Sequence, residues 1–324
     1  MHKEFLMGNA AIALGAVAAG VNVVAGYPGT PSTEVLETIA KHRPDDVYVE
    51  WSVNEKAAME LAAGASYAGA RSMVTMKQVG LNVASDPLMS LEYVGIKGGM
   101  VILVADDPGP ISSQTEQDTR HFSRFSKLPC FDPSSAQEAY EMIQEAFEYS
   151  EKYGTPVFLR PTTRVCHGYA SIMVKDETEY THHQPEGFIK DSKRWVIFPR
   201  LSFMNHKKIE ARNQELSDIF SSYEKNTIHP SCDAFKDSKK GIATGGISYT
   251  YTMETLKKTG MVKTLKIATP HPFPEKLAVD FLSGLDEVLC LEELDPVIER
   301  ELIYICGKYH LPTRISGKLS GHTA

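Results

Sequence analysis

The 324-residue sequence contains no apolar run that is suited to spanning a membrane. Its longest apolar stretch, residues 10–26, consists largely of Ala and Gly and is interrupted by Asn22. The residues before it include Glu4 and lack the basic cluster with which a signal peptide begins. We therefore expect neither a membrane span nor an export signal, and we expect a cytoplasmic location.

Basic runs are also missing from this acidic sequence. It contains 34 Lys and Arg residues against 41 Asp and Glu residues, which gives a formal charge of −7. Because a nucleic-acid partner requires a basic face that neutralises phosphates, we do not expect this chain to bind nucleic acid.

Cysteine is scarce, and no two cysteines have the spacing of a known site. Their odd number disfavours a disulfide framework, and no Cys-x-x-Cys pair occurs. No zinc or iron–sulfur site can be built from them with family-like spacing. We therefore expect core thiols and no metal site in this chain. The five residues are Cys130, Cys166, Cys232, Cys290 and Cys306.

Helical periods alternate with short β-rich runs from the start of the chain to about Thr163. This alternation is typical of βαβ units and predicts an α/β fold with a parallel sheet covered on both faces. The expected strands are 22–26, 47–51, 72–76, 100–104, a short one near Pro129, and 156–159. The expected helices are 10–19, 31–41, 55–70, 83–93 and 135–152.

The alternation stops at about Val165 and resumes at Gly241, which predicts two domains. We assign residues 1–164 to the first domain, 165–240 to a connecting segment with one helix over 207–223, and 241–324 to a smaller α/β domain. The strands expected in the second domain are 241–244, 264–268 and 287–291, and its helices are 249–258, 274–282 and 295–309.

The first candidate site is the turn GYPGTPST over residues 26–33, which follows an apolar strand. Open α/β sheets place ligands at this end of their strands. With Thr30 as N-cap and Pro31 as first helical residue, the free N–H groups of the next helix would favour a carboxylate or phosphate. The alternative interpretation is an ordinary capped strand-to-helix turn.

The second candidate is Glu55, which begins the helix after the next strand. A carboxylate at this apolar junction could act as a proton donor, and the alternative is a first-turn glutamate that stabilises the helix dipole. The same helix carries small residues on one face: Ala58, Ala62, Ala65 and Gly69. We predict that this face is an interface with a second copy or another subunit.

Two further segments follow buried strands. The stretch MKQVGLN, residues 76–82, predicts a turn through Gly80 that could present backbone groups to a flat heterocycle, although any strand-to-helix turn would look similar. The long polar loop that begins at Asp106 could line a site. Asp106 and Asp107 could bind a metal there, although adjacent carboxylates more often form a solvated turn. In the second domain, His271 is expected to be structural.

Four stretches, in order across the first domain, together resemble the thiamine-diphosphate-dependent 2-oxoacid:ferredoxin oxidoreductases, and within them the indolepyruvate-type α subunits. The stretches are GYPGTPSTE from Gly26, EWSVNEKAAMELAAGASYAGAR from Glu50, VTMKQVGLNVASDPLMS from Val74 and VADDPG from Val104. The second domain, with CLEELDPVIE from Cys290, looks like the transketolase-C-terminal-like domain that follows in this family. The resemblance covers both folded domains.

This resemblance implies that the first domain is the pyrimidine-binding domain of the thiamine fold. In the family, a glutamate hydrogen-bonds N1′ of the aminopyrimidine and promotes the tautomer that removes the thiazolium C2 proton, and Glu55 occupies its place. Val79, Gly80 and Asn82 match the turn that passes beside the aminopyrimidine.

The resemblance also implies a substrate-binding turn. Gly29 and Thr30 match it, with Thr30 in the place of the threonine that contacts the substrate carboxylate. Related pyruvate enzymes use an arginine in the loop after the strand that ends at Val104, and this sequence has Asp106 and Asp107 there instead.

Two family motifs are missing from the sequence. There is no Gly-Asp-Gly followed by the Asn that completes the diphosphate/Mg²⁺ motif, and no Cys-x-x-Cys-x-x-Cys cluster for [4Fe-4S] clusters. In the α subunits that it resembles, both lie C-terminal to the region present here. We therefore expect the chain to be an N-terminal half, either truncated or naturally split, and to be inactive alone.

The expected function is a share in the oxidative decarboxylation of indolepyruvate or other arylpyruvates to an acyl-CoA, with ferredoxin as acceptor. The expected partners are CoA, a chain or domain with the diphosphate/Mg²⁺ motif, a small γ-type (β) subunit and ferredoxin, in a homo- or hetero-oligomer. Two alternatives stay open: a subunit of a non-oxidative thiamine-dependent 2-oxoacid decarboxylase, or a non-catalytic paralogue that lacks the cofactor domain.

Overall fold

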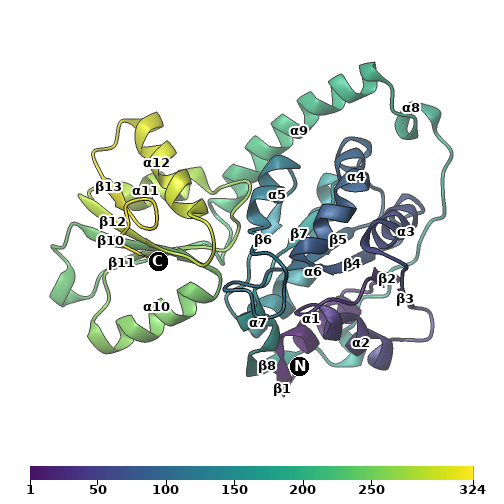
Figure 1. Ribbon diagram of the computed structural model, residues 1–324, viewed down its shortest axis with the longest axis horizontal. Coiled ribbons are helices and arrows are strands. Elements are labelled where there is room, and N and C mark those ends of the chain that lie inside the picture. The colour runs from purple at the N-terminus through teal and green to yellow at the C-terminus, as the bar shows by residue number, and fades with distance from the viewer. Residues whose placement is uncertain (324) are drawn as a thin grey trace.

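The computed structural model describes residues 1–323, which form two α/β bodies side by side (Figure 1). The first body is built around a six-stranded, wholly parallel sheet with the order β3-β2-β4-β5-β7-β6. Its strands are β2 (Val23–Gly26), β3 (Tyr48–Trp51), β4 (Ser72–Lys77), β5 (Met100–Ala105), β6 (Cys130–Phe131) and β7 (Val157–Leu159).

Helices cover both faces of this sheet, so its central strands are apolar throughout. Met73 and Val101 belong to one core, with α1, α2 and α6, while their neighbours Val74 and Ile102 belong to the other, with α3 and α4. This is the pattern expected of parallel strands that are buried on both faces. The helices are α1 (Gly8–Ala18), α2 (Thr33–His42), α3 (Glu55–Tyr67), α4 (Gln78–Val94), α5 (Arg120–Phe125), α6 (Ala136–Tyr153) and α7 (Thr163–His167).

The segment between the two sheets contains one strand and ends in a long helix. Strand β8 (Tyr169–Val174) pairs antiparallel with β1 (His2–Met7) beside the first body. The chain then forms η1 (Glu177–Glu179), α8 (Ser192–Trp195) and the long helix α9 (Pro199–Phe220), which arch over the first body in Figure 1. Trp195 anchors the arch by packing on Tyr67, with the two ring centroids 4.9 Å apart.

The second body contains a five-stranded sheet with the order β13-β12-β10-β11-β9, parallel except for β9. Helix α10 lies on one face, and α11 and α12 lie on the other (Figure 1). The elements are β9 (Thr227–His229), η2 (Asp233–Phe235), β10 (Lys240–Gly245), α10 (Gly246–Thr259), β11 (Lys263–Ile267), α11 (Glu275–Leu282), β12 (Glu287–Leu291), α12 (Val297–Tyr309) and β13 (Arg314–Ser316).

The α/β fold with a parallel sheet is confirmed, and each predicted helix and strand is present, most of them with shifted ends. The elements that the sequence pattern did not predict are short or lie at sheet edges, such as β1, β8, β9 and β13. The cysteines are free thiols, of which Cys232 alone is partly exposed. Within residues 1–323, no helix is long and apolar enough to cross a membrane.

Two local predictions at helix starts were wrong. Thr30 is not the N-cap of α2, because the backbone N–H of Ser32 donates to the carbonyl of Gly29 at 2.9 Å and closes a turn before the helix starts at Thr33. Gly80 is not in a turn, because β4 runs directly into α4 at Gln78 and places Gly80 in the first helical turn.

The small-residue face of α3 was also interpreted wrongly as an intersubunit surface. Ala58 and Ala62 are fully buried in this chain's own core, where they pack with Leu81 and Ala84 of α4. Gly69 is buried beside the backbone of Glu186 in the arch. The small residues therefore allow a close approach of α3 to α4 and to the connecting segment.

Candidate functional site

The predicted site residues gather at the carboxyl edge of the parallel sheet. Parallel strands end at the same edge, so the segments that follow four of them lie together there. These segments are the turn after β2, the start of α3 after β3, the start of α4 after β4 and the loop after β5. This edge therefore brings Thr30, Glu55, Gly80 and Asp106 to one side of the molecule from four separate segments.

Glu55 lies against the bare Cα of Gly80. A Cβ atom on Gly80 would fall 2.5 Å from Oε1 and 2.9 Å from Cδ of Glu55, so residue 80 must lack a side chain for the carboxylate to rest there. Asn54 is the N-cap that begins the helix, and its side chain accepts a hydrogen bond from the N–H of Ala57 at 2.9 Å. Glu55 is partly buried, and within residues 1–323 its carboxylate has no hydrogen-bond or ion-pair partner.

The turn after β2 is held by its own hydrogen bonds. The N–H of Gly29 donates to Oγ1 of Thr33 at 2.9 Å, and the hydroxyl of Ser32 donates to the carbonyl of Gly29 at 2.9 Å. These bonds leave Thr30 exposed at the tip of the turn. The carbonyl of Thr30 lies 3.5 Å from the hydroxyl of Ser112, which belongs to the loop after β5.

The loop after β5 crosses over the start of α4. The amides of Asn82 and Gln117 exchange two hydrogen bonds, at 3.1 and 3.2 Å, and Gln78 donates to the carbonyl of Thr115 at 3.2 Å. Val79 is partly buried between these contacts. The loop therefore forms a wall beside the predicted pyrimidine-side residues.

Asp107 fixes the shape of that wall. Its Oδ2 atom accepts hydrogen bonds from the backbone N–H groups of Ile111, Ser112 and Ser113 at 3.0, 2.9 and 3.1 Å, and Oδ1 accepts one from the hydroxyl of Thr163 at 2.8 Å. Burial opposes the charge on Asp107, but these hydrogen bonds outweigh it and lower the pKa of the carboxyl. With only 1% of Asp107 exposed, the solvated-turn interpretation was wrong.

Asp106 belongs to a buried ionic network that reaches the second body. Arg160 donates to Asp106 at 2.7 Å and lies 3.7 Å from Asp118, while Arg120 binds Asp118 at 2.5 Å and Glu292 at 2.9 Å. Burial raises the pKa of Asp106 to about 6 against the effect of Arg160. Burial would also raise the pKa of Asp118, but the two guanidinium groups lower it below its ordinary value. The base of the loop is therefore tied to the second body.

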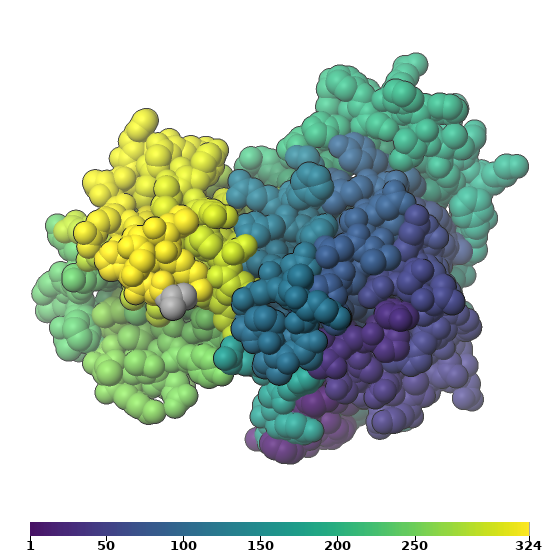
Figure 2. Space-filling model, in the orientation of Figure 1, coloured from purple at the N-terminus to yellow at the C-terminus, as the bar shows by residue number. Residues whose placement is uncertain are grey.

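Among the described residues, one cluster has the spacing of metal ligands, and it lies where this ionic network joins the two bodies. Ligand atoms of Asp118, His121 and Asp295 lie within 4.8 Å of one another. Asp118 accepts from Arg120 and from the backbone N–H of Asp295, and His121 bonds Asp295 at 2.9 Å. These groups join the two bodies. Figure 2 shows the blue surface of the first body in close contact with the yellow surface of the second.

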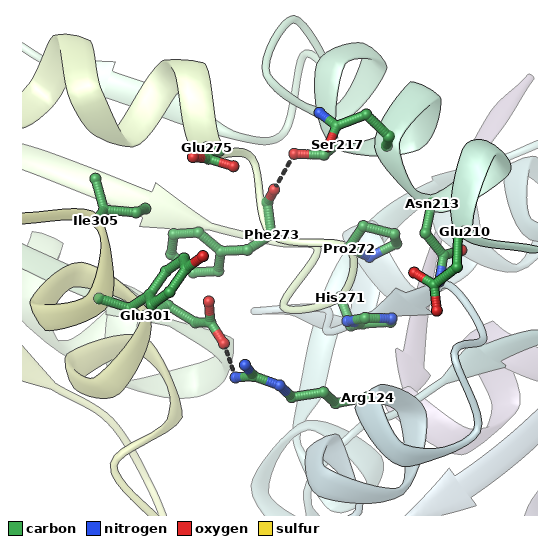
Figure 3. A pocket seen from close by; sticks show the side chains of 12 residues that line it. Arg124, Glu210, Asn213, Ser217, His271, Pro272, Phe273, Glu275, Glu301 and Ile305 are labelled. Carbon is green, nitrogen blue, oxygen red and sulfur yellow. Dashed lines mark hydrogen bonds and ion pairs between the residues drawn. The ribbon is translucent and has the colours of Figure 1, made fainter. Parts of the chain in front are cut away.

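A groove between the bodies, with a cavity volume of about 220 Å³, contains none of the predicted site residues (Figure 3). His271 lies on its wall, and its carbonyl accepts a hydrogen bond from the N–H of Cys130 at 2.7 Å. Burial, together with nearby cations such as Arg124, lowers the pKa of His271 to about 3. A neutral imidazole in a domain junction agrees with the structural role expected from the sequence.

Two site residues were missed in the sequence. Lys77 is the last residue of β4, and its amine donates to the side-chain oxygen of Gln114 at 3.2 Å above the turn that contains Gly29. The signal was available, because a charged residue that ends a buried strand must point out at the carboxyl edge. Gln114 could not have been found, because its position depends on the fold of the long loop.

The arrangement fits one end of a flat, hydrogen-bonding heterocycle. An unpartnered carboxylate, Glu55, lies beside the bare Cα of Gly80, and the partly buried Val79 lies in the same helical turn. A carboxyl group in this position can exchange a hydrogen bond with one ring nitrogen of such a heterocycle. The described residues at this edge offer no comparable grip for a diphosphate with its metal.

Comparisons with known proteins identify relatives of this chain. Residues 14–230 match the family described as pyruvate flavodoxin/ferredoxin oxidoreductase, thiamine diphosphate-binding. The chain is 43% identical to the indolepyruvate oxidoreductase subunit IorA of Methanothermobacter thermautotrophicus and 40% identical to that of Pyrococcus horikoshii, over 98% of this chain in each case. It covers 51% and 49% of these two proteins, so it spans about half the length of the curated relatives it matches.

Solved structures show the same fold at low sequence identity. A 2-oxoglutarate:ferredoxin oxidoreductase from Magnetococcus marinus aligns with a TM-score of 0.76 and 17% identity, over 97% of this chain and 62% of that one. A split-gene transketolase aligns with a TM-score of 0.61 and 15% identity, over 96% of this chain and 87% of that one. The chain therefore belongs to the pyruvate flavodoxin/ferredoxin oxidoreductase family and contains its thiamine diphosphate-binding domain.

Proposed function

We propose that this chain supplies the aminopyrimidine side of a thiamine diphosphate site in a 2-oxoacid:ferredoxin oxidoreductase that acts on arylpyruvates such as indolepyruvate. The observation that carries the proposal is the unpartnered carboxylate of Glu55 against the bare Cα of Gly80, at the carboxyl edge of the sheet. The relatives named for indolepyruvate, at 40–43% identity, support the substrate class. A 2-oxoglutarate synthase subunit is less similar, with 30% identity over 55% of the chain, which favours an arylpyruvate over 2-oxoglutarate as the substrate.

When bound, thiamine diphosphate supplies the electron sink that decarboxylation of a 2-oxo acid requires. Glu55 would share a proton with N1′ of the aminopyrimidine, and its partial burial beside Gly80 would shield this hydrogen bond from water. Val79 and Gly80 would pack beside the ring, and Asn82 would close the site through its bonds to Gln117. Gly29 and Thr30 would meet the substrate carboxylate at the neighbouring turn.

The remaining parts of the site would come from elsewhere. We propose that a partner chain or domain provides the diphosphate and Mg²⁺ grip and the [4Fe-4S] clusters, and that a small γ-type (β) subunit, CoA and ferredoxin complete the reaction in a cytoplasmic complex. This division follows from the missing Gly-Asp-Gly and cysteine-cluster motifs in the sequence. The chain alone should therefore neither bind the cofactor tightly nor turn over substrate.

Reconstitution tests the proposal. The chain is mixed with a candidate partner that carries the diphosphate motif, and arylpyruvate-dependent reduction of ferredoxin is measured with and without CoA. We expect reduction that requires both chains and CoA, with indolepyruvate preferred over 2-oxoglutarate. Aldehyde formation without ferredoxin or CoA would identify a non-oxidative decarboxylase instead. A complex that binds no thiamine diphosphate and turns over no 2-oxo acid would refute the proposal.

A further inference from the structure

Lys77 lies at the centre of the site edge, between the turn after β2 and the loop after β5. It is the last residue of β4, whose neighbours in the sheet are β2 and β5. Its side chain therefore leaves the sheet between the turn that carries Thr30 and the loop that carries Gln114.

The stem of Lys77 is held in place by contact with Gly29. A Cβ atom on Gly29 would lie 3.1 Å from Cγ and 3.2 Å from Cδ of Lys77, which is tight packing. The missing side chain at Gly29 therefore allows the lysine stem to lie over the turn. Gln114 then accepts a hydrogen bond from the amine at 3.2 Å.

The amine of Lys77 has only this neutral partner among the described residues. It forms no ion pair within residues 1–323, whereas Lys56, at the start of α3, pairs with Asp86 at 2.7 Å. The two arginines beneath the loop, Arg120 and Arg160, are buried and bound to carboxylates. Lys77 is therefore the cation of this edge whose charge is available to a ligand.

We propose that Lys77, with the stem supported by Gly29, binds the C1 carboxylate of the 2-oxo acid substrate. This inference rests on the proposed function, because it assumes that Glu55 marks the cofactor end of the same sheet edge. An anion would take the place of the neutral Gln114 oxygen, and hydrogen bonds between charged groups are shorter and stronger than those to neutral acceptors. The exposed hydroxyl of Thr30 is on the same turn and would complete the contact.

A single available cation also favours one class of substrate. An arylpyruvate carries one carboxylate, which Lys77 can neutralise. 2-Oxoglutarate carries two, and within residues 1–323 this edge provides no second unpaired cation for its distal carboxylate. The residues that this chain contributes to the substrate site therefore select a monocarboxylic 2-oxo acid.

The test compares Lys77→Met, Lys77→Arg and Lys56→Met in the reconstituted complex with an arylpyruvate. In Lys77→Met we expect KM to rise about 10- to 100-fold, the range expected for loss of a charged hydrogen bond, with a much smaller change in kcat. Lys77→Arg should restore most of the affinity because it keeps the charge. Lys56→Met, which removes an equal charge from an exposed pair at the same edge, should change KM less than about twofold.

Two inhibitors separate charge recognition from general damage. Phenylacetate and phenylacetamide have nearly the same shape, and only the first has a carboxylate. Lys77→Met should weaken inhibition by phenylacetate about 10-fold or more and leave phenylacetamide unchanged. Gly29→Ala, which displaces the lysine stem, should weaken phenylacetate in the same direction, so the inference does not depend on one variant.

The exchange of the thiamine C2 proton separates the two proposals. If the wild-type complex exchanges this proton and turns over substrate, but Lys77→Met keeps the wild-type KM and phenylacetate affinity, the role of Lys77 is refuted and the proposed function stands. Equal losses for phenylacetate and phenylacetamide would also refute it. If the wild-type complex shows neither exchange nor turnover, the proposed function itself fails.

Discussion

The carboxylate of Glu55 occupies the space in which a side chain at residue 80 would lie. A Cβ atom there would be 2.5 Å from Oε1 of Glu55, so the position of this glutamate at the start of α3 requires a glycine in the first turn of α4. The contact places an unpartnered carboxylate beside a bare backbone, and the first two predictions below depend on it.

Glu55→Gln should leave folding intact and slow C2–H exchange of bound thiamine in the reconstituted complex. Glutamine keeps the size and a hydrogen bond, but it cannot give and take the proton. General acid–base assistance is typically about 10²–10⁴-fold, and we expect a loss at the upper end of this range. Deuterium exchange, followed by NMR after acid quench, measures it.

Glu60→Gln is the matched control for that variant. Glu60 is on the same helix, but 58% of its side chain is exposed. The Glu60→Gln variant should exchange the C2 proton of bound thiamine at the wild-type rate. Wild-type exchange in Glu55→Gln, or a comparable loss in Glu60→Gln, would place the catalytic carboxylate elsewhere.

Gly80→Ala should displace the Glu55 carboxylate and reduce C2–H exchange while the fold persists. The added methyl group meets the carboxylate rather than backbone, so the glutamate can move aside. Gly64→Ala provides the control, because a Cβ at Gly64 in the middle of α3 meets nothing within 4 Å. That variant should keep wild-type exchange and gain about 0.5–1 kcal/mol of stability from helix propensity. Equal exchange in the two alanine variants would argue against the Glu55–Gly80 contact as the site.

The sequence alone predicted the scaffold well and the local contacts poorly. Strands such as β5 are short, continuous apolar runs, so their length and the turn residues that flank them identify them, and each is followed by its own candidate loop. In contrast, the small residues Ala58 and Ala62 predict close packing, but their sequence pattern does not indicate whether the packing partner is α4 or another subunit. The roles of Asp106 and Asp107 depend on Arg160 and on loop N–H groups that meet them only in the folded chain. Local patterns could not reveal these long-range pairings.

Ala62→Leu should destabilise the chain without changing its oligomeric state. Ala62 is fully buried between α3 and α4, so the larger side chain forces strain that typically costs about 1–3 kcal/mol. Urea unfolding measures the stability, and sedimentation velocity measures the mass. A changed sedimentation coefficient with unchanged stability would show that the face contacts another subunit after all.

Arg120→Met should destabilise the junction between the two bodies far more than Arg124→Met. Arg120 is buried and binds Asp118 and Glu292, so its removal takes away the closest cation of two buried carboxylates, at a cost of about 3–5 kcal/mol. Arg124 also reaches the second body, through Glu301, but 61% of its side chain is exposed, and its loss should cost less than about 1 kcal/mol. Similar unfolding midpoints for the two variants would mean that the buried network does not stabilise the junction.

Glu92→Gln should make the chain more stable at pH 8 and leave its stability nearly unchanged near pH 4. Glu92 is 4% exposed, and Oε1 has no hydrogen-bond partner among the described residues. Burial raises its pKa from an ordinary value of 4.5 to about 7, although Arg212 and Lys127 act in the opposite direction. The folded chain therefore binds this proton more tightly than the unfolded chain does. Stability must then fall as the pH rises from about 4.5 to about 7.

The glutamine variant lacks this titration, so the difference from the wild type should grow over the same interval. It should reach about 1–3 kcal/mol above pH 7, with the variant the more stable protein. Urea unfolding at pH 4.5, 6 and 8 measures the difference, and Glu60→Gln, which changes an exposed carboxylate, should follow the wild type at each pH. If the wild type and Glu92→Gln differ by the same amount at all three pH values, Glu92 does not titrate in this range, and its burial is offset by contacts in the folded chain.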